Sequence, residues 1–459
     1  MIQVFTLSLF VIVCISGLLT PSAAFALGLA MYVFEQALQG SVDIFASRTA
    51  LVNIIVALSI GISAIRSGLR SGRLFNHYFN PIFVGTILIY FWYLATMLWS
   101  PSSGAAMELI EANVPYFVLF VLVIPLLIRE IADLLPAFRW TMLVGVCILG
   151  SILFNPSFTF RDGRLSLALT ALVRTNPLVL GEFAGIVLIF SALITRGPGG
   201  IFYQGVRALA FIVGAIIALQ SGSRGQLVFA IVVAVAFIPM ARKVKSISGF
   251  FGTFVLVGTV LTGTLFIASK VLFLDLLARW DFRNIAQGSG HRLSNILELG
   301  EAWARQPTAW IFGLGGNAYS TVTATGGIEE YPHNIFAEII AELGIPCLVL
   351  FLFMLGQTVR SILWLYRRYS DDPEIRIAIA SLAALFTYEF FLTNKQGNLW
   401  SNVLLFSMMI IVSRIHAQVL ARDEEDAWQR GEEYEAGQIL TDEPMENPPE
   451  AAHYPAQAP

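Results

Sequence analysis

The residues best suited to chemistry lie in residues 281–344, a long polar interruption in a chain that otherwise consists of apolar runs. This segment contains Arg292, the triplet Pro332-His333-Asn334 and a glycine cluster at residues 313–316. A histidine and an arginine on one loop are components of a site that removes a proton and holds an anion. No strand precedes the glycine cluster, so we interpret it as tight turns or a flexible loop, not as a nucleotide-binding loop.

His333 is the candidate general base. The apolar run that begins at residue 335 places His333 at the N-terminus of a predicted helix, where the helix dipole and nearby arginines disfavour the imidazolium form. Neutral imidazole is the form that accepts a proton. Glu329 and Glu330 act in the opposite sense, so the protonation state stays open. A histidine that only caps or hydrogen-bonds the loop is the simpler alternative.

Arginine is enriched on the predicted outer face of the membrane, where basic residues should be scarce. Alternating the apolar runs assigns eight arginines to this face: Arg161, Arg164, Arg174, Arg224, Arg279, Arg283, Arg292 and Arg305. Lysine contributes only Lys270 and Lys395. Guanidinium groups bind phosphate oxygens in bidentate fashion, so the set predicts a phosphate or pyrophosphate site. For any single arginine, pairing with a nearby carboxylate or contact with lipid headgroups is an equal alternative.

Two outer helix N-termini carry the most informative arginines. Arg224 lies in Ser221-Gly222-Ser223-Arg224-Gly225, a turn between two apolar runs, where it adds a fixed charge to a helix N-terminus. A turn capped by Ser223 would explain the serines and glycines but not the arginine. Arg161, Arg164 and Arg174 precede Pro177, which is expected in the first turn of the next helix.

Other polar residues could support this site. Glu338 and Glu342 follow His333 by one and two helical turns, and we expect them to enter the membrane and to pair with an arginine or bind a sugar hydroxyl. Asn334 is a supporting candidate. The outer segments contain no His and carboxylate cluster with metal-ligand spacing, so no metal and no cofactor is predicted.

Composition indicates which elements position these residues. Of 459 residues, 56% are hydrophobic and 13% are charged, whereas a soluble domain carries about 25% charged residues. Apolar runs of this length satisfy their backbone hydrogen bonds as helices, which predicts an all-α polytopic membrane protein. Three cysteines (Cys14, Cys147 and Cys347) lie inside apolar runs and are predicted as core residues.

About twelve transmembrane helices are predicted from thirteen apolar runs, at residues 3–19, 22–38, 49–65, 81–99, 114–128, 140–154, 178–195, 205–220, 224–240, 249–273, 335–365, 375–391 and 399–415. Pro21 leaves open whether the first two runs cross separately or form one broken, partly re-entrant segment. Basic residues gather in the loops of one face, which is therefore predicted to be cytoplasmic: Arg66, Arg70, Arg73, Arg196, Arg207, Arg242, Lys243, Lys245, Arg367, Arg368 and Arg376.

The predicted organisation is a membrane domain over residues 1–415 and an acidic tail over residues 416–459. The membrane domain includes one large periplasmic loop, residues 274–334, in which residues 292–306 are predicted to form an amphipathic helix on the membrane surface. Leu293 and Leu297 belong to its predicted apolar side. The tail is rich in Glu, Pro and Ala, and we expect it to be disordered and cytoplasmic.

Residues 170–415 resemble the O-antigen ligase/polymerase family of bacterial inner-membrane glycosyltransferases. The resemblance rests on Ser221-Gly222-Ser223-Arg224-Gly225, on Arg292 followed by Gly313-x-Gly315-Gly316, and on Pro332-His333-Asn334 followed by Glu342-x-Gly344-Ile345-Pro346. It implies transfer of a glycan from undecaprenyl pyrophosphate to an acceptor hydroxyl at the periplasmic face, without metal or nucleotide, and with inversion at the anomeric carbon.

The resemblance also implies residue roles. His333 would activate the acceptor, and Arg224 and Arg292 would hold the pyrophosphate, with Arg161, Arg164 and Arg174 as weaker additions. His291, directly before Arg292, departs from the pattern and offers a second imidazole.

Membership of this family leaves the acceptor open. A ligase transfers the glycan to the lipid A core, which we favour, whereas a polymerase transfers it to a second lipid-linked glycan. A flippase or transporter of an anionic lipid-linked substrate would also explain many spans and outer arginines, but it predicts charges deep in the spans and paired half-repeats. A structural membrane subunit is the remaining alternative, and it would not require the arginines.

Overall fold

The computed structural model describes residues 2–72, 74–161, 164–167, 176–243, 248–249, 251–252, 255, 258–259, 263, 282–323 and 331–441. The chain forms two compact units, residues 1–416 and residues 417–459. The first unit contains the candidate site. The predicted run at 249–273 falls largely outside the described residues.

The first unit is built almost entirely of helices. Its N-terminal part contains α1 (Ile2–Leu19), α2 (Pro21–Leu29), α3 (Met31–Gln39), α4 (Asp43–Ser47), α5 (Ala50–Ser71), α6 (Pro81–Thr96), α7 (Ser103–Phe117), the π-helix η1 (Val118–Val123), α8 (Ile124–Leu127) and α9 (Ile131–Leu153). A hairpin of β1 (Phe158–Arg161) and β2 (Arg164–Leu167) precedes α10 (Pro177–Leu193), α11 (Ile201–Gln220) and α12 (Arg224–Arg242). The remaining elements are α15 (Phe282–Ala304), α16 (Ala309–Phe312), α17 (Tyr319–Val322), α18 (Ile335–Glu338), the π-helix η2 (Ile339–Leu343), α19 (Ile345–Arg368), α20 (Pro373–Thr393) and the first part of α21 (Val403–Thr441), whose residues from 417 onward belong to the second unit.

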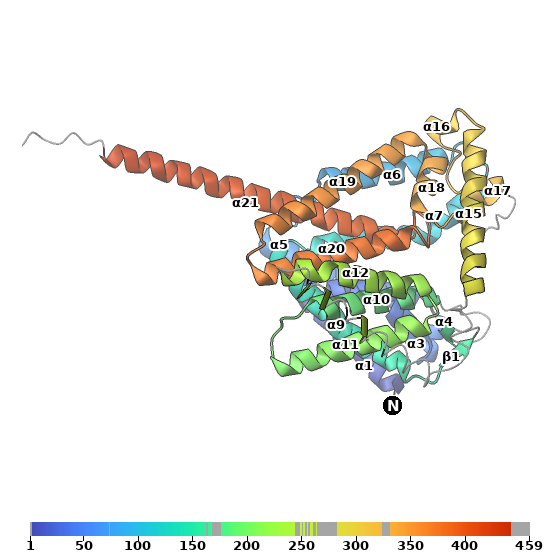
Figure 1. The fold of residues 1–459 in the computed structure, drawn as a ribbon, viewed down its shortest axis with the longest axis horizontal. Coiled ribbons are helices and arrows are strands. Elements are labelled where there is room, and N and C mark those ends of the chain that lie inside the picture. Colours follow the sequence, from blue (N-terminus) through green and yellow to red (C-terminus); the bar gives the residue numbers. More distant parts are fainter. Residues whose placement is uncertain are drawn as a thin grey trace, which may run out of the picture. The chain divides into compact units, whose positions relative to one another are not determined.

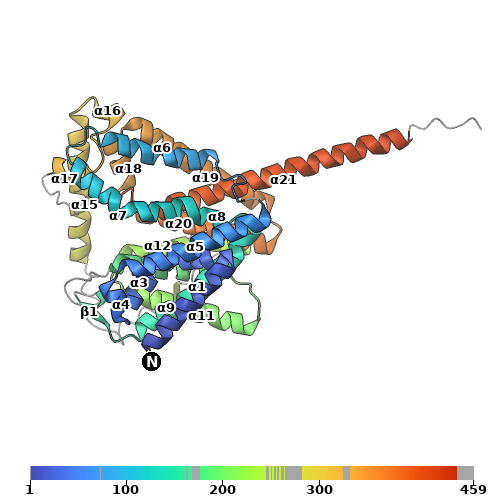
Figure 2. The same ribbon diagram turned by 180° about the vertical axis from the view of Figure 1, so that it is seen from behind.

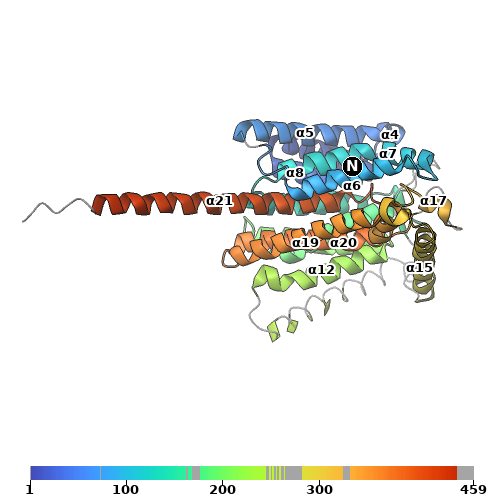
Figure 3. The ribbon, with the colours of Figure 1, turned by 90° about the horizontal axis from the view of Figure 1, so that it is seen from above.

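The chain is a multi-pass helical membrane protein. Within the described residues, nine helical segments are long and apolar enough to cross a bilayer, and two shorter apolar helices, α6 and α10, accompany them. Viewed from above, α5, α12, α19 and α20 run along a common direction (Figure 3). α15 instead crosses the end of these helices at a steep angle (Figure 1).

α10 lies at the centre of the bundle. It packs against α9, α11, α12 and α20, and nearly all of its residues from Leu180 to Leu193 are buried. An apolar sequence on every side suits a helix that is enclosed by others. Gly185 permits the closest approach, because a Cβ at this position would lie 2.1 Å from the hydroxyl of Tyr388 in α20.

The helices before α6 pack on one another and on α9. α1 ends at Leu19 and α2 begins at Pro21. The helix is interrupted here because proline has no N–H with which to continue the helical hydrogen bonds. α2 is buried and contacts α1, α5 and α9, and α1 also packs directly on α5 (Figure 2). The predicted run 22–38 is therefore two short helices, α2 and α3.

Hydrogen bonds gather several of the predicted cytoplasmic loops at one end of the bundle, which we call the basic end. Arg139 donates to the carbonyl of Arg196 (2.8 Å) and pairs with Glu374 (3.4 Å). Lys243 forms an ion pair with Asp371 and thereby lowers the pKa of that exposed carboxyl group. Arg376 donates to the carbonyl of Ala241 in α12 (3.3 Å).

Arg414 joins the last helix to earlier loops at this end. Arg414 is buried, with only 1% of the residue exposed. The guanidinium donates to the carbonyls of Leu74 and Pro125 (both 2.8 Å), Asn76 (3.1 Å) and Ile128 (3.4 Å). A charged donor that binds four carbonyls satisfies polar groups that would otherwise be buried without partners.

Two sequence-based expectations are wrong. The run 335–365 is not one helix, because Gly344 (φ 88°) separates the α18–η2 segment from α19. The chain is helical to Thr441 where disorder was predicted from residue 416; Glu, Gln and Ala there favour helix even without an apolar face.

Candidate functional site

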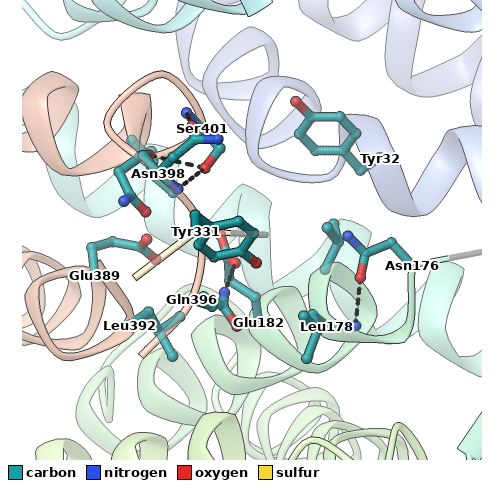
Figure 4. A pocket seen from close by; sticks show the side chains of 14 residues that line it. Tyr32, Asn176, Leu178, Glu182, Tyr331, Glu389, Leu392, Gln396, Asn398 and Ser401 are labelled. Atoms are coloured by element: carbon teal, nitrogen blue, oxygen red, sulfur yellow. Dashed lines mark hydrogen bonds between the residues drawn. The ribbon is translucent and has the colours of Figure 1, made fainter. Parts of the chain in front are cut away.

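A polar cavity of about 290 Å³ lies at the end of the bundle opposite the basic end. It is formed by the first turns of α10, the last turn of α20, the loop that follows α20, Tyr32 of α3 and Tyr331. Figure 4 shows the polar side chains around it, including Glu182, Glu389, Tyr331 and Gln396. We call this cavity the α10–α20 pocket. Carboxylates, amides and tyrosine hydroxyls together suit a ligand rich in hydroxyl groups.

Glu182 ends a chain of hydrogen-bonded side chains along one wall of the pocket. Gln396 donates to its carboxylate through Nε2 (2.8 Å) and accepts from Gln226 of α12. Gln226 in turn accepts from the ammonium group of Lys395. The chain connects α10, α12 and the loop after α20, so it fixes the walls of the pocket relative to one another.

Glu389 is the second carboxylate of the pocket and is held less completely. The residue is 4% exposed and lies within electrostatic reach of Glu182. Its Oε1 has no hydrogen-bond partner among the described residues. A buried oxygen of this kind costs free energy unless a ligand or water satisfies it.

Glu338 supports the pocket from outside. Its carboxylate accepts a hydrogen bond from the backbone N–H of Leu399 (2.8 Å). The hydroxyl of Tyr90 donates to the carbonyl of Leu399 (2.9 Å). Asn398 and Ser401 close this loop by exchanging side-chain and backbone hydrogen bonds (Figure 4). Glu338 therefore holds the backbone of the loop that lines the pocket.

Glu342 and the glycine cluster form the neighbouring support. The carboxylate of Glu342 accepts from the backbone N–H groups of Asn317 (2.8 Å) and Tyr319 (3.2 Å). A Cβ on Gly313 would lie 2.0 Å from the carbonyl oxygen of Glu342, and one on Gly315 would lie 2.4 Å from Ser100. The glycines are therefore required because this segment packs closely against η2 on one side and the turn after α6 on the other. This packing favours tight turns over a flexible loop.

His333 lies beside the pocket. Its ring packs on that of Tyr331, which lines the cavity, with 4.3 Å between the ring centroids. It is half-buried and has left-handed backbone geometry (φ 55°), which histidine adopts more readily than most residues. Asn334 follows as the cap of α18 and accepts from the N–H of Ala337 (2.9 Å). His333 therefore stands just before a helix, as the sequence indicates.

Arg224 follows the Ser-Gly turn that links α11 to α12. It is the first residue of α12, and Gln226, two residues later, belongs to the Glu182 chain. The hydroxyl of Ser223 donates to the carbonyl of Pro177 (3.4 Å) and makes no capping bond to α12. The capping alternative for Ser223 is therefore wrong, and the Ser-Gly turn instead joins α12 to the start of α10. Pro177 is the first residue of α10, as predicted.

The other predicted arginines are described only in part. Arg164 lies half-buried on β2, opposite Arg161 on β1. His291 and Arg292 lie in α15, but their side chains, like that of Arg161, are outside the described part of the chain, and Arg174 is wholly outside it. Of the predicted set, His333 lies beside the α10–α20 pocket, Glu338 holds the loop that lines it and Asn334 caps the helix that follows His333, whereas Arg224 is placed only at the start of α12.

The predicted amphipathic helix is present as part of α15. α15 buries Asn295 and Leu299, and Leu299 packs with Ala309, Leu314 and Tyr319. Leu293 and Leu297, on the predicted apolar side, are 59% and 62% exposed. Exposed apolar residues on a helix that crosses the end of the bundle are suited to contact lipid at the membrane surface.

Glu182, Glu389 and Gln396 are the pocket residues that sequence reasoning missed. Both glutamates lie inside predicted apolar runs, and an ionisable residue within a membrane span is itself a functional signal. Among the described residues, no group of three or more His, Cys, Asp or Glu side chains is arranged to hold a metal ion. The chain matches no protein-family model and no curated protein.

Proposed function

We propose that this chain is a glycosyltransferase of the O-antigen ligase/polymerase type, which transfers a glycan from undecaprenyl pyrophosphate to an acceptor sugar hydroxyl. The observation that carries the proposal is the position of His333, whose ring packs on Tyr331 of the α10–α20 pocket, a cavity also lined by the carboxyl groups of Glu182 and Glu389. The reaction needs a base beside a polar cavity, and Arg224, the first residue of α12, is the arginine that we assign to the pyrophosphate.

In the proposed step, His333 takes the proton of the acceptor hydroxyl, and the oxygen forms a bond to the anomeric carbon of the donor glycan. The bond from that carbon to the pyrophosphate oxygen breaks, and undecaprenyl pyrophosphate leaves with the bonding electrons. Arg224 and Arg292, with Arg161, Arg164 and Arg174 as further donors, stabilise the developing charge. Attack from the face opposite the leaving group inverts the anomeric configuration.

Glu182 and Glu389 bind the acceptor in this proposal. Carboxylate oxygens accept hydrogen bonds from sugar hydroxyls, and the free Oε1 of Glu389 is such an acceptor. Tyr32 and Tyr331 offer ring faces and hydroxyl groups to the same ligand.

The proposed setting is the bacterial inner membrane. In this setting about twelve spans place the α10–α20 pocket and the loop 274–334 on the periplasmic side and the basic end in the cytoplasm, and the outer arginines are the exception to the charge rule that a pyrophosphate site explains. The acceptor we favour is the lipid A core, which makes the enzyme a ligase.

The test is His333→Asn in the source bacterium. Asparagine tolerates the left-handed backbone that alanine would strain, so this change removes the imidazole with little effect on folding. His77→Asn is the matched control, because His77 is another histidine with positive φ (53°) outside the pocket. We expect His333→Asn to reduce glycan transfer by about 100-fold or more and His77→Asn to leave it unchanged, as read from surface glycan on gels.

The products of the same strains distinguish the acceptors. Loss of every glycan attached to lipid A, with accumulation of lipid-linked polymer, identifies a ligase. Attachment that survives for single repeat units identifies a polymerase. Normal surface glycan from a well-expressed His333→Asn protein would refute the catalytic role.

A further inference from the structure

A second polar cavity, of about 240 Å³, lies near the basic end of the bundle, away from the α10–α20 pocket. It is enclosed by the junction of α1 and α2, the C-terminal part of α5 and a residue of the turn that precedes α9. Three arginines line it, Arg66, Arg70 and Arg129, together with Ser63 and Ser67. Its described lining contains no carboxylate, so the positive charge within it is not neutralised there.

Two arginines of this cavity are fixed by hydrogen bonds to backbone carbonyls and keep further N–H groups that can bind a ligand. Arg66 donates through Nη1 to the carbonyl of Leu18 (3.0 Å), and Arg129 donates through Nη1 to the carbonyl of Ser67 (3.0 Å). Each guanidinium has five N–H donors, and these bonds use one nitrogen of each. Asp133, an acid close by in sequence, accepts from the backbone N–H groups of Arg129 (2.9 Å) and Glu130 (3.0 Å).

Ser63 provides an independent sign of a ligand. The residue is 2% exposed and lines the cavity, and its hydroxyl has no hydrogen-bond partner among the described residues. A buried hydroxyl is costly unless a ligand or water meets it. Beside arginines, the ligand that suits it is an oxyanion that accepts from both the hydroxyl and the guanidinium groups.

The surface next to the cavity is apolar. Leu58, Ile62, Ile65 and Leu69 are exposed on α5 at helical spacing, and Ile15 and Leu19 are exposed on α1. α1 and α5 pack side by side (Figure 2). The exposed residues of α5 lie at helical spacing with Arg66 and Arg70, so the apolar surface adjoins these arginines. An acyl chain can pack on such a surface, whereas a free phosphate ion has no apolar part to contact it.

We propose that this cavity binds the phosphate group of an anionic membrane phospholipid, whose acyl chains lie against α1 and α5. Arg66, Arg70 and Arg129 bind the phosphate oxygens, and Ser63 donates a hydrogen bond to one of them. The site is separate from the proposed transfer reaction, because none of these residues lines the α10–α20 pocket. Inorganic phosphate shares the headgroup chemistry and is the alternative source that the experiment must exclude.

The experiment measures lipid binding by the full chain, purified in detergent, with native mass spectrometry and thermal unfolding. The probes are phosphatidylglycerol, phosphatidylcholine and inorganic phosphate. Arg70→Glu is the principal variant, because Arg70 is exposed and its removal breaks no described backbone contact. Arg367→Glu, at an exposed arginine of α19 outside the cavity, is the control with the same change of charge.

We expect phosphatidylglycerol to bind and to raise the unfolding temperature more than phosphatidylcholine does. Arg70→Glu should weaken phosphatidylglycerol binding about fivefold or more, and Arg367→Glu should not. Ser63→Val, which removes the hydroxyl without changing charge, should weaken it in the same direction. Equal weakening by both arginine variants would overturn the site, and an equal response to inorganic phosphate would overturn its assignment to lipid.

Discussion

At the scale of single residues, Glu389 is the pocket side chain whose role is most directly testable. We expect Glu389→Gln to raise the KM for the acceptor about tenfold while kcat changes less, because one carboxyl oxygen becomes an amide NH2 that cannot accept a hydrogen bond from the acceptor hydroxyl, and the proposed base is untouched. Glu108→Gln, at an exposed glutamate of α7, is the control and should leave both constants unchanged. The measurement is transfer by purified enzyme at varied acceptor concentration; a fall in kcat alone would contradict the binding role.

The types and order of several site residues could be predicted from the sequence, but their partners could not. His333 and Arg224 stand at helix N-termini because Asn334 and the Ser-Gly turn are local signals. The sequence predicts that Glu338 and Glu342 pair with an arginine or bind a sugar hydroxyl. They bind backbone N–H groups of Leu399, Asn317 and Tyr319 instead, and such long-range contacts leave no local pattern.

At the scale of elements, the junction between η2 and α19 depends on Gly344. A Cβ there would lie 2.3 Å from the carbonyl oxygen of Ile311, in a backbone conformation that other residues adopt at a cost. We expect Gly344→Ala to destabilise the protein by roughly 2 kcal/mol and to reduce transfer, since η2 carries Glu342.

Gly356→Ala is the matched control for this change. Gly356 lies inside α19, and a Cβ there meets open space, so alanine should be neutral or slightly stabilising. Thermal unfolding in detergent compares the two variants, and similar melting temperatures would contradict the role of Gly344. Hydropathy alone merges η2 with α19, because the apolar run passes through the break without interruption.

At the scale of the whole molecule, Arg414 connects the last helix of the bundle to loops formed much earlier in the chain. Arg414→Met keeps the bulk but leaves the carbonyls of Leu74 and Pro125 without their donor, so we expect a loss of about 3 kcal/mol or more of stability. Arg360→Met, at an exposed position on α19, should melt close to the unchanged protein. Equal melting of the two variants would show that the four contacts do not stabilise the bundle.

The orientation of the bundle can be measured with single cysteines in a background without Cys14, Cys147 and Cys347. Thr308→Cys, in the turn between α15 and α16, should react with an impermeant maleimide in cells with an opened outer membrane. Asp371→Cys, at the basic end, should react only after the inner membrane is permeabilised. The reverse pattern would place the α10–α20 pocket in the cytoplasm and exclude the proposed periplasmic reaction.

Arg414 also determines when, during synthesis, the helical bundle can be completed. The carbonyls of Leu74, Asn76, Pro125 and Ile128 lack this donor until α21 leaves the ribosome, more than 280 residues after Ile128 is synthesised. Until then the membrane holds an incomplete bundle with buried polar groups unsatisfied, which costs free energy. Nascent chains that end before residue 403 should therefore be degraded rapidly by membrane proteases, and pulse-chase labelling of truncated chains would measure this directly.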